Sequence, residues 1–242
     1  MLNRTIVSIA VVVLVLFSRP VLSQPSATRG EQICDVSADA ALGLEDYPAA
    51  IRLHRSLLRL HPNDALAHYH LGFAYGMTGH SSKEIDEYRR AVTLGLRSWD
   101  LFLNLGLAYA EGLDFANAAQ ALQHAVLLAP QRPEAHFNLA LAYEKENRFK
   151  DALREIKISR RLDPGDLDAQ NTEAILCAEL DDRTCAHNLW THLIQIAPEY
   201  YPARMNLRTI NRTSCATPVD LQPVSGLLKT PAGRKNQFRS PS

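Results

Sequence analysis

Apolar and small side chains recur along the chain with the spacing of an α-helix, and the pattern is interrupted at regular intervals. Over residues 99–110, Phe102, Leu105 and Tyr109 lie three or four residues apart, so they share one face of a helix. The pattern stops, resumes over 116–128 and ends before a proline, which has no amide hydrogen for a continuing helix. This stretch predicts two helices joined by a short turn.

The two-helix pattern returns every 34 residues, because five columns align without a gap when the chain is shifted against itself by that number. The columns hold Leu71, Leu105 and Leu139; Gly72, Gly106, Ala140 and Ala174; Tyr75, Tyr109 and Tyr143; Ala50, Ala118, Ala152 and Ala186; and Pro62, Pro130, Pro164 and Pro198. The glycine and alanine columns allow antiparallel helices to approach closely. A two-helix unit has too little interior to be stable alone, so the units must stack on one another.

The segment 102–109, together with Ala118, Ala125 and Pro130, resembles the tetratricopeptide repeat. This resemblance implies an all-α fold, a right-handed superhelical solenoid of about five helix-turn-helix repeats with a capping helix. The repeats are predicted at 31–64, 65–98, 99–132, 133–166 and 167–200, and the capping helix at 201–210.

In this family, the first helix of each repeat lines a concave groove that receives a peptide. Carried over by position, the resemblance implies a groove lined by Tyr69, Phe73, Leu103, Leu107, Phe137, Leu141, Asn171 and Ile175, with Asp100, Glu134 and Asp168 at its edge. An apolar floor with a carboxylate rim favours a peptide or protein with apolar anchors and basic flanks. The alternative is that many of these apolar side chains form the core between repeats.

The first residues have the pattern of a targeting segment. Arg4 precedes an apolar run at 6–17, and small or modest side chains follow at 21–23. This order is typical of a secretory signal peptide, which predicts cleavage after residue 23, a linker at 24–30 and export to the periplasm or the exterior. An uncleaved membrane anchor is the alternative, and it is the one membrane contact that we expect.

Charge is unevenly distributed along the rest of the chain. Residues 31–210 hold 18 basic and 25 acidic side chains, a net charge of −7, whereas the segment 211–242 holds five basic side chains against Asp220 alone. The segment 211–242 also lacks helical periodicity, so it is predicted to be a disordered basic tail. It is either solvated or tethered close enough to occupy the acidic groove.

The four cysteines suggest one internal disulfide. Cys177 and Cys185 fall on opposite arms of the fifth predicted hairpin, where they form either a disulfide or two buried thiols. Cys34 and Cys215 fall near opposite ends of the stack, so they are free or join two chains. Whether they pair between chains, and which oligomeric state the protein has, is left open by the sequence.

Candidate chemistry is sparse. His54, His61, His68 and His70 are the one metal-like group, but no cysteine or acid completes a familiar spacing, so no metal and no cofactor are expected. The chain lacks a nucleophile elbow, a phosphate-binding loop and other catalytic motifs, so no enzyme activity is expected. Basic residues at 145–161 lie on an outer helix with local partners such as Asp151 for Arg154, so no nucleic-acid binding is expected.

These observations predict a non-catalytic scaffold that binds a peptide segment or a partner protein in the concave groove after export. One alternative is a structural unit that associates with itself or with a cell-envelope complex. The other alternative is a regulatory accessory subunit of an enzyme.

Overall fold

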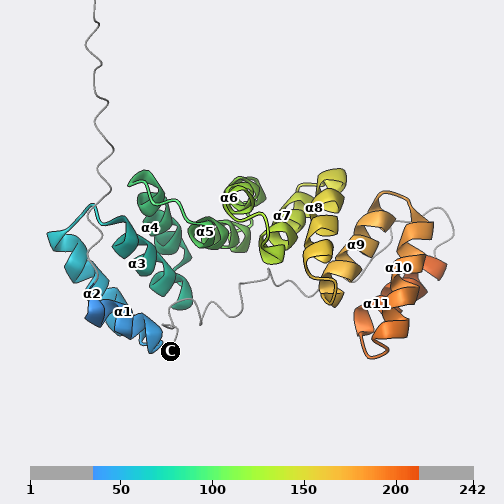
Figure 1. The fold of residues 1–242 in the computed structure, drawn as a ribbon, viewed down its shortest axis with the longest axis horizontal. Helices are drawn as coiled ribbons and strands as arrows, with labels where there is room; N and C mark the ends of the chain where they lie inside the picture. Colours follow the sequence, from blue (N-terminus) through green and yellow to red (C-terminus); the bar gives the residue numbers. More distant parts are fainter. Residues whose placement is uncertain (1–34, 213–242) are drawn as a thin grey trace, which may run out of the picture.

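The structure is a computed structural model that describes residues 35–212, and within that range every regular element is an α-helix. The eleven helices are α1 (Val36–Gly43), α2 (Tyr47–Leu60), α3 (Ala65–Met77), α4 (Ser81–Thr93), α5 (Trp99–Glu111), α6 (Phe115–Leu128), α7 (Pro133–Lys145), α8 (Phe149–Leu162), α9 (Leu167–Glu179), α10 (Arg183–Ile196) and α11 (Tyr201–Arg212). They form a curved row of antiparallel pairs (Figure 1), so the all-α solenoid predicted from the sequence is confirmed.

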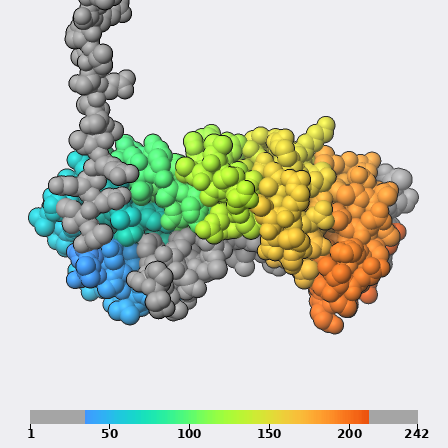
Figure 2. Space-filling view, in the orientation of Figure 1, coloured from blue at the N-terminus to red at the C-terminus, as the bar shows by residue number. Residues whose placement is uncertain are grey.

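Each helix contacts the next one along the chain, and the first helices of successive repeats also contact one another, α3 with α5 and α5 with α7. Direct contact between first helices places them on the inner side of the curve, as Figure 1 shows for α3 and α5 beneath α4 and α6. Figure 2 shows the repeats following one another without interruption along one elongated body. Every repeat is therefore stabilised mainly by its immediate neighbours.

Aspartates begin many of the helices. The carboxylates of Asp35, Asp46, Asp64, Asp114, Asp166 and Asp182 accept hydrogen bonds from backbone amides in the first turns that follow them. Asp64, for example, accepts from the amides of Leu66 and Ala67, both at 3.0 Å. Such caps satisfy amides that have no partner inside the helix.

The turn inside each repeat uses a residue with a left-handed backbone at one fixed position. These residues are Glu45, Gly79, Leu113, Asn147 and Asp181, with φ between 59° and 75°. They are spaced by 34, as the columns of the sequence are, but only one of them is the glycine that this conformation favours. The other four repeats therefore accept backbone strain at this turn.

Small residues allow the two helices of a repeat to pack closely against each other. A Cβ atom added to Gly106 would lie 2.6 Å from Leu122 Cγ, and one added to Gly72 would lie 2.7 Å from Tyr88 Cδ1. The alanines of the same and the facing column are fully buried, namely Ala140, Ala174, Ala118, Ala152 and Ala186. Pro130, Pro164 and Pro198 lie in the turns that separate repeats, where each follows the end of a helix.

The C-terminal helix closes the array. Ala203 and Ile210 of α11 are buried against α10, whereas Arg204 and Arg208 are exposed, so α11 carries an apolar inner face and a polar outer face. It extends to Arg212, two residues beyond the predicted end of the capping helix. The predicted signal peptide, the linker, Cys34, Cys215 and the tail from residue 213 lie outside the described residues. No helix within residues 35–212 is long and apolar enough to cross a bilayer.

Candidate protein-binding surface

The inner side of the curve is formed by the first helices of the repeats, and the structure buries most of the apolar side chains expected there. Exposed fractions lie between 0 and 6% for Tyr69, Phe73, Leu103, Leu107, Phe137, Asn171 and Ile175, and Leu141 is half-buried. Neighbouring first helices touch, so side chains at these positions fill the space between repeats. This burial favours the alternative in which these side chains form the core between repeats. The exposed part of the inner face is therefore more polar than the apolar groove floor that the resemblance implied.

The three carboxylates expected at the edge are accessible and lie on three successive repeats. Asp100, Glu134 and Asp168 are half-buried, and each lies in the first turn of its helix, α5, α7 or α9. The amides at a helix N-terminus carry partial positive charge, which stabilises carboxylates there. We call these three residues the acidic row.

Two tyrosine hydroxyls, one from the preceding repeat and one from the segment just before α11, orient two members of the acidic row. The Tyr69 hydroxyl donates to Asp100 Oδ2 at 2.9 Å, and the Tyr200 hydroxyl donates to Asp168 Oδ1 at 2.7 Å. Burial and, next, the hydrogen bond to Asp168 raise the pKa of Tyr200, so it keeps its proton. Each hydrogen bond uses one carboxylate oxygen and fixes the direction of the group.

More acidic side chains follow at the opposite ends of the same helices. Glu111 and Glu179 are exposed, and the half-buried Glu144 contacts Lys145 at 3.1 Å. Burial, and then the negative charge of Glu144, raise the pKa of Glu179 above its ordinary value. Two carboxylates of adjacent repeats thus repel each other across this edge, and a cation placed between them would relieve that repulsion.

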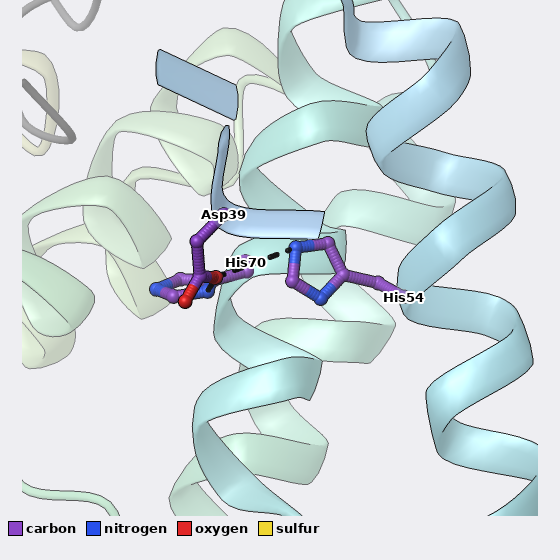
Figure 3. Close-up of side chains that lie close together, drawn as sticks. All are labelled: Asp39, His54 and His70. Carbon is purple, nitrogen blue, oxygen red and sulfur yellow. Dashed lines mark ion pairs between the residues drawn. The ribbon is translucent and has the colours of Figure 1, made fainter. Parts of the chain in front are cut away.

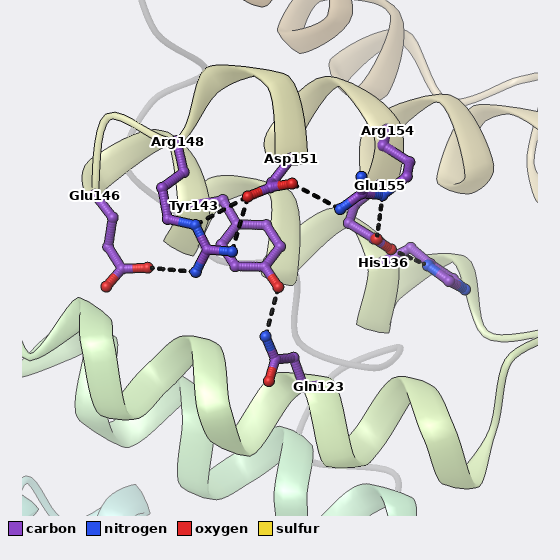
Figure 4. A network of polar contacts seen from close by, with 8 residues as sticks. All are labelled: Gln123, His136, Tyr143, Glu146, Arg148, Asp151, Arg154 and Glu155. Atoms are coloured by element: carbon purple, nitrogen blue, oxygen red, sulfur yellow. Dashed lines mark hydrogen bonds and ion pairs between the residues drawn. The ribbon is translucent and has the colours of Figure 1, made fainter.

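Arg148, which precedes α8, and Arg154 of α8 lie in a network of local pairs (Figure 4). Asp151 accepts from Arg148 at 2.8 Å and from Arg154 at 2.7 Å, so the expected pair of Asp151 with Arg154 is present. These hydrogen bonds, that from Arg148 first, lower the pKa of the Asp151 carboxyl. Arg148 also lies 4.0 Å from the centre of the Tyr143 ring. The positive charges of Arg148 and Arg154 are therefore already matched within the protein.

The sulfur atoms of Cys177 and Cys185 lie at disulfide distance, 2.14 Å, with the Cα atoms 5.9 Å apart. The bond joins α9 to the beginning of α10, close to the turn at Asp181. The pair therefore has the spacing that a disulfide requires.

The histidine cluster differs from the expected one. Both ring nitrogens of His68 have other partners: its Nδ1 lies 2.6 Å from Glu87 Oε2 and its Nε2 lies 3.1 Å from the Pro62 carbonyl oxygen. His54 instead lies beside His70, with ring centres 5.2 Å apart, and Asp39 of α1 completes the group. Sequence spacing missed Asp39 because it lies on a different helix and in the repeat with the weakest sequence pattern.

Comparisons with known proteins agree with this geometry. The family model for the tetratricopeptide repeat matches residues 36–99 and 103–166. No match is found among curated proteins.

Solved structures have the same fold. "YrrB: a TPR protein with an unusual peptide-binding site" is 24% identical at a TM-score of 0.67, and the match covers 69% of this chain and 87% of that one. The protein MamA is 22% identical at a TM-score of 0.63, with 67% and 95% covered. MamA 41-end from Desulfovibrio magneticus RS-1 is 18% identical at a TM-score of 0.62, with 68% and 93% covered. At these identities the likeness establishes the fold that the chains share.

Proposed function

Because the chain belongs to the tetratricopeptide repeat family, whose members bind peptides or proteins, we propose that its inner face binds a protein segment with Lys or Arg side chains. In this proposal the protein is a non-catalytic scaffold. The acidic row of Asp100, Glu134 and Asp168 is the observation that carries it.

The acidic row supports a basic partner on three grounds. The carboxylates are accessible, they recur on successive repeats, and tyrosine hydroxyls hold Asp100 and Asp168 in fixed directions. A partner in an extended conformation can place basic side chains at regular intervals along such a row. Carboxylates that are already oriented lose less conformational entropy when a guanidinium or ammonium group binds them.

The test begins with a displayed library of random peptides selected against the purified protein. We expect the selected peptides to be enriched in Lys or Arg, and their affinity to fall as salt is added. In the triple variant Asp100→Asn, Glu134→Gln, Asp168→Asn, the affinity should fall about tenfold, since three surface pairs at about 0.5 kcal/mol each contribute about 1.5 kcal/mol in total.

In a matched control, three exposed acidic residues outside the acidic row are replaced by the corresponding amides, as Asp86→Asn, Asp163→Asn and Glu199→Gln. It has the same change in net charge, so its affinity for the selected peptides should stay close to that of the parent protein. Equal losses in both triple variants would show a general charge effect and would remove the acidic row from the binding site.

We also propose that the chain is exported, with its first 23 residues removed as a signal peptide. The order of charged, apolar and small residues supports this, and so does the cysteine pair at disulfide distance, because disulfides persist mainly in oxidising compartments. N-terminal sequencing of the protein isolated from its producing cells tests the idea. A first residue of Gln24 supports cleavage, and an intact Met1 refutes it.

A second candidate function is association of the protein with copies of itself. Large apolar side chains are exposed near both ends of the array, Val36 and Leu44 at 79% and 80%, and Ile196 and Tyr201 at 52% and 64%. Such surfaces favour end-to-end contact between copies. Light scattering that gives a single chain mass at all protein concentrations would refute it.

A further inference from the structure

Three side chains from three helices converge at the N-terminal end of the array (Figure 3). Asp39 comes from α1, His54 from α2 and His70 from α3. His70 Nδ1 lies 2.9 Å from Asp39 Oδ1, and His54 Nε2 lies 3.9 Å from the same oxygen. One ligand atom of each residue lies within 4.8 Å of the other two.

His54 is the unusual member of this group. Its side chain is 1% exposed, and neither ring nitrogen has a hydrogen-bond partner. A buried imidazole without partners loses the hydrogen bonds that it made to water, and nothing in this arrangement replaces them. Burial also lowers the pKa of His54 to about 4, so the ring is neutral at physiological pH and one nitrogen carries a free lone pair.

The surroundings of His54 are negatively charged. Asp39 is ionised, because the hydrogen bond from His70 lowers the pKa of its carboxyl below the ordinary value. Asp35 and Asp64, which cap α1 and α3, also act on His54 through space. A cation at this position would gain from all three carboxylates.

The spacing is close to that of a metal site. Ligand atoms bound at 2.0–2.1 Å around a tetrahedral zinc ion lie about 3.3 Å from one another. The two distances to Asp39 Oδ1, 2.9 and 3.9 Å, lie on either side of this value, so each changes by less than 1 Å when an ion binds. The proton that His70 Nδ1 donates to Asp39 would then be carried on Nε2, which leaves Nδ1 free to bind the ion. The Asp39 side chain is 37% exposed, which gives an ion a route from solvent and leaves room for a water molecule as the fourth ligand.

We propose that Asp39, His54 and His70 bind a divalent transition-metal ion, best matched by zinc, that fastens α1 to α2 and α3. Two imidazoles and one carboxylate are a donor set that suits zinc and related divalent ions, and the ion supplies the partner that His54 lacks. α1 has only eight residues, so an ion bound to it and to its two neighbours would stabilise the exposed end of the solenoid.

The test uses isothermal titration calorimetry of the full chain with zinc chloride alone, in a background where Cys34 and Cys215 are replaced by serine so that free thiols add no sites. We expect one zinc ion per chain and a rise in the melting temperature on zinc addition. Bound cobalt should show the visible absorption typical of a four-coordinate site. Asp39→Asn and His54→Gln should each weaken zinc binding by at least about tenfold, whereas His187→Gln, at an exposed histidine of α10, should not.

Asp39→Asn is the decisive variant, because asparagine keeps a hydrogen-bond acceptor for His70 at a partly exposed position and should not disturb the fold, as circular dichroism can verify. Zinc binding of equal strength in Asp39→Asn and the parent would overturn the proposal, because it would place the ion elsewhere. Binding weaker than about 1 mM in the parent chain would overturn it as well.

Discussion

Replacing Leu113 by glycine should stabilise the protein, although glycine usually weakens a folded chain. Leu113 has φ of 61° in the turn between α5 and α6, and its side chain is 75% exposed. A side chain in this left-handed conformation costs about 1–2 kcal/mol, which glycine does not incur. The same turn one repeat earlier holds Gly79 at φ 75°, so the fold accepts glycine at this position.

The expected magnitude is the difference between two opposing effects. Relief of backbone strain contributes about 1–2 kcal/mol, and the greater freedom of glycine in the unfolded chain removes about 0.5–1 kcal/mol. Little buried surface is lost, because three quarters of the Leu113 side chain is already in solvent. Leu113→Gly should therefore raise the free energy of unfolding by about 0.5–1 kcal/mol and the melting temperature by about 2–3 °C for an array of this size.

Two matched variants separate this effect from the general effect of glycine. Leu127 is exposed to the same extent, 76%, but has a right-handed helical backbone in the last turn of α6, so Leu127→Gly should lower the free energy of unfolding by about 0.5 kcal/mol. Gly79→Ala should also destabilise, and only through its backbone, since a Cβ atom there would meet no atom within 4 Å. Urea denaturation followed by circular dichroism measures all three, with an unchanged dependence on urea as the check that the unfolding transition is the same. Loss of stability in Leu113→Gly equal to that in Leu127→Gly would refute the strain argument.

Three further changes test other features. Gly106→Ala should lower the melting temperature, because its Cβ atom would lie 2.6 Å from Leu122 Cγ and overpacking costs about 1–3 kcal/mol. Gly112→Ala is the control and should be close to neutral, because the nearest neighbour of its Cβ atom would lie at 3.4 Å. Equal melting temperatures of the two variants would contradict this prediction. Reducing the bond between Cys177 and Cys185, which are eight residues apart, should lower the free energy of unfolding by about 2.5 kcal/mol, according to the relation between loop length and chain entropy. A melting temperature that dithiothreitol does not change would show that the bond is absent or has no effect on stability. His54 has a pKa of about 4 in the folded protein and an ordinary value near 6.5 when unfolded, so the unfolded chain binds the extra proton in between. With metal removed by a chelator, the free energy of unfolding should stay constant above about pH 6.5 and fall by about 3 kcal/mol toward pH 4. A His54→Phe variant should show a smaller fall. An equal fall in this variant would mean that other titrating groups cause the pH dependence.

The repeat architecture was predictable because its contacts are local and recur with the period of the sequence. Gly106 meets Leu122 within one hairpin, and Cys177 meets Cys185 across one turn, so spacing along the chain is enough to pair them. The left-handed turn position was not identified, although it repeats with the same period. Unlike the glycine and alanine columns, it holds five different residue types, and only Gly79, Asn147 and Asp181 are of types that favour the conformation.

The binding surface was less predictable, because burial depends on how the repeats curve. Phe137 and Leu103 were expected in an open groove, but α5 and α7 approach closely enough to cover them. The metal candidate was missed for a similar reason. Asp39, His54 and His70 are separated by 15 and 16 residues, and only the packing of three helices brings them together. A contact between residues that do not recur with the repeat period cannot be inferred from a single sequence.

Peptide binding and the stability of the stack should be coupled in this protein. Asp100, Glu134 and Asp168 lie on three successive repeats, and two of them are oriented by Tyr69 of the preceding repeat and by Tyr200 at the end of the fifth repeat, next to α11. The spacing of the acidic row is therefore set by the packing between repeats rather than within them, and it changes if the array flexes. A change that rigidifies the stack reduces the ordering cost of binding, so it should tighten the complex without touching the partner. Flexing that separates the repeats should instead break the tyrosine hydrogen bonds and weaken the row as a unit.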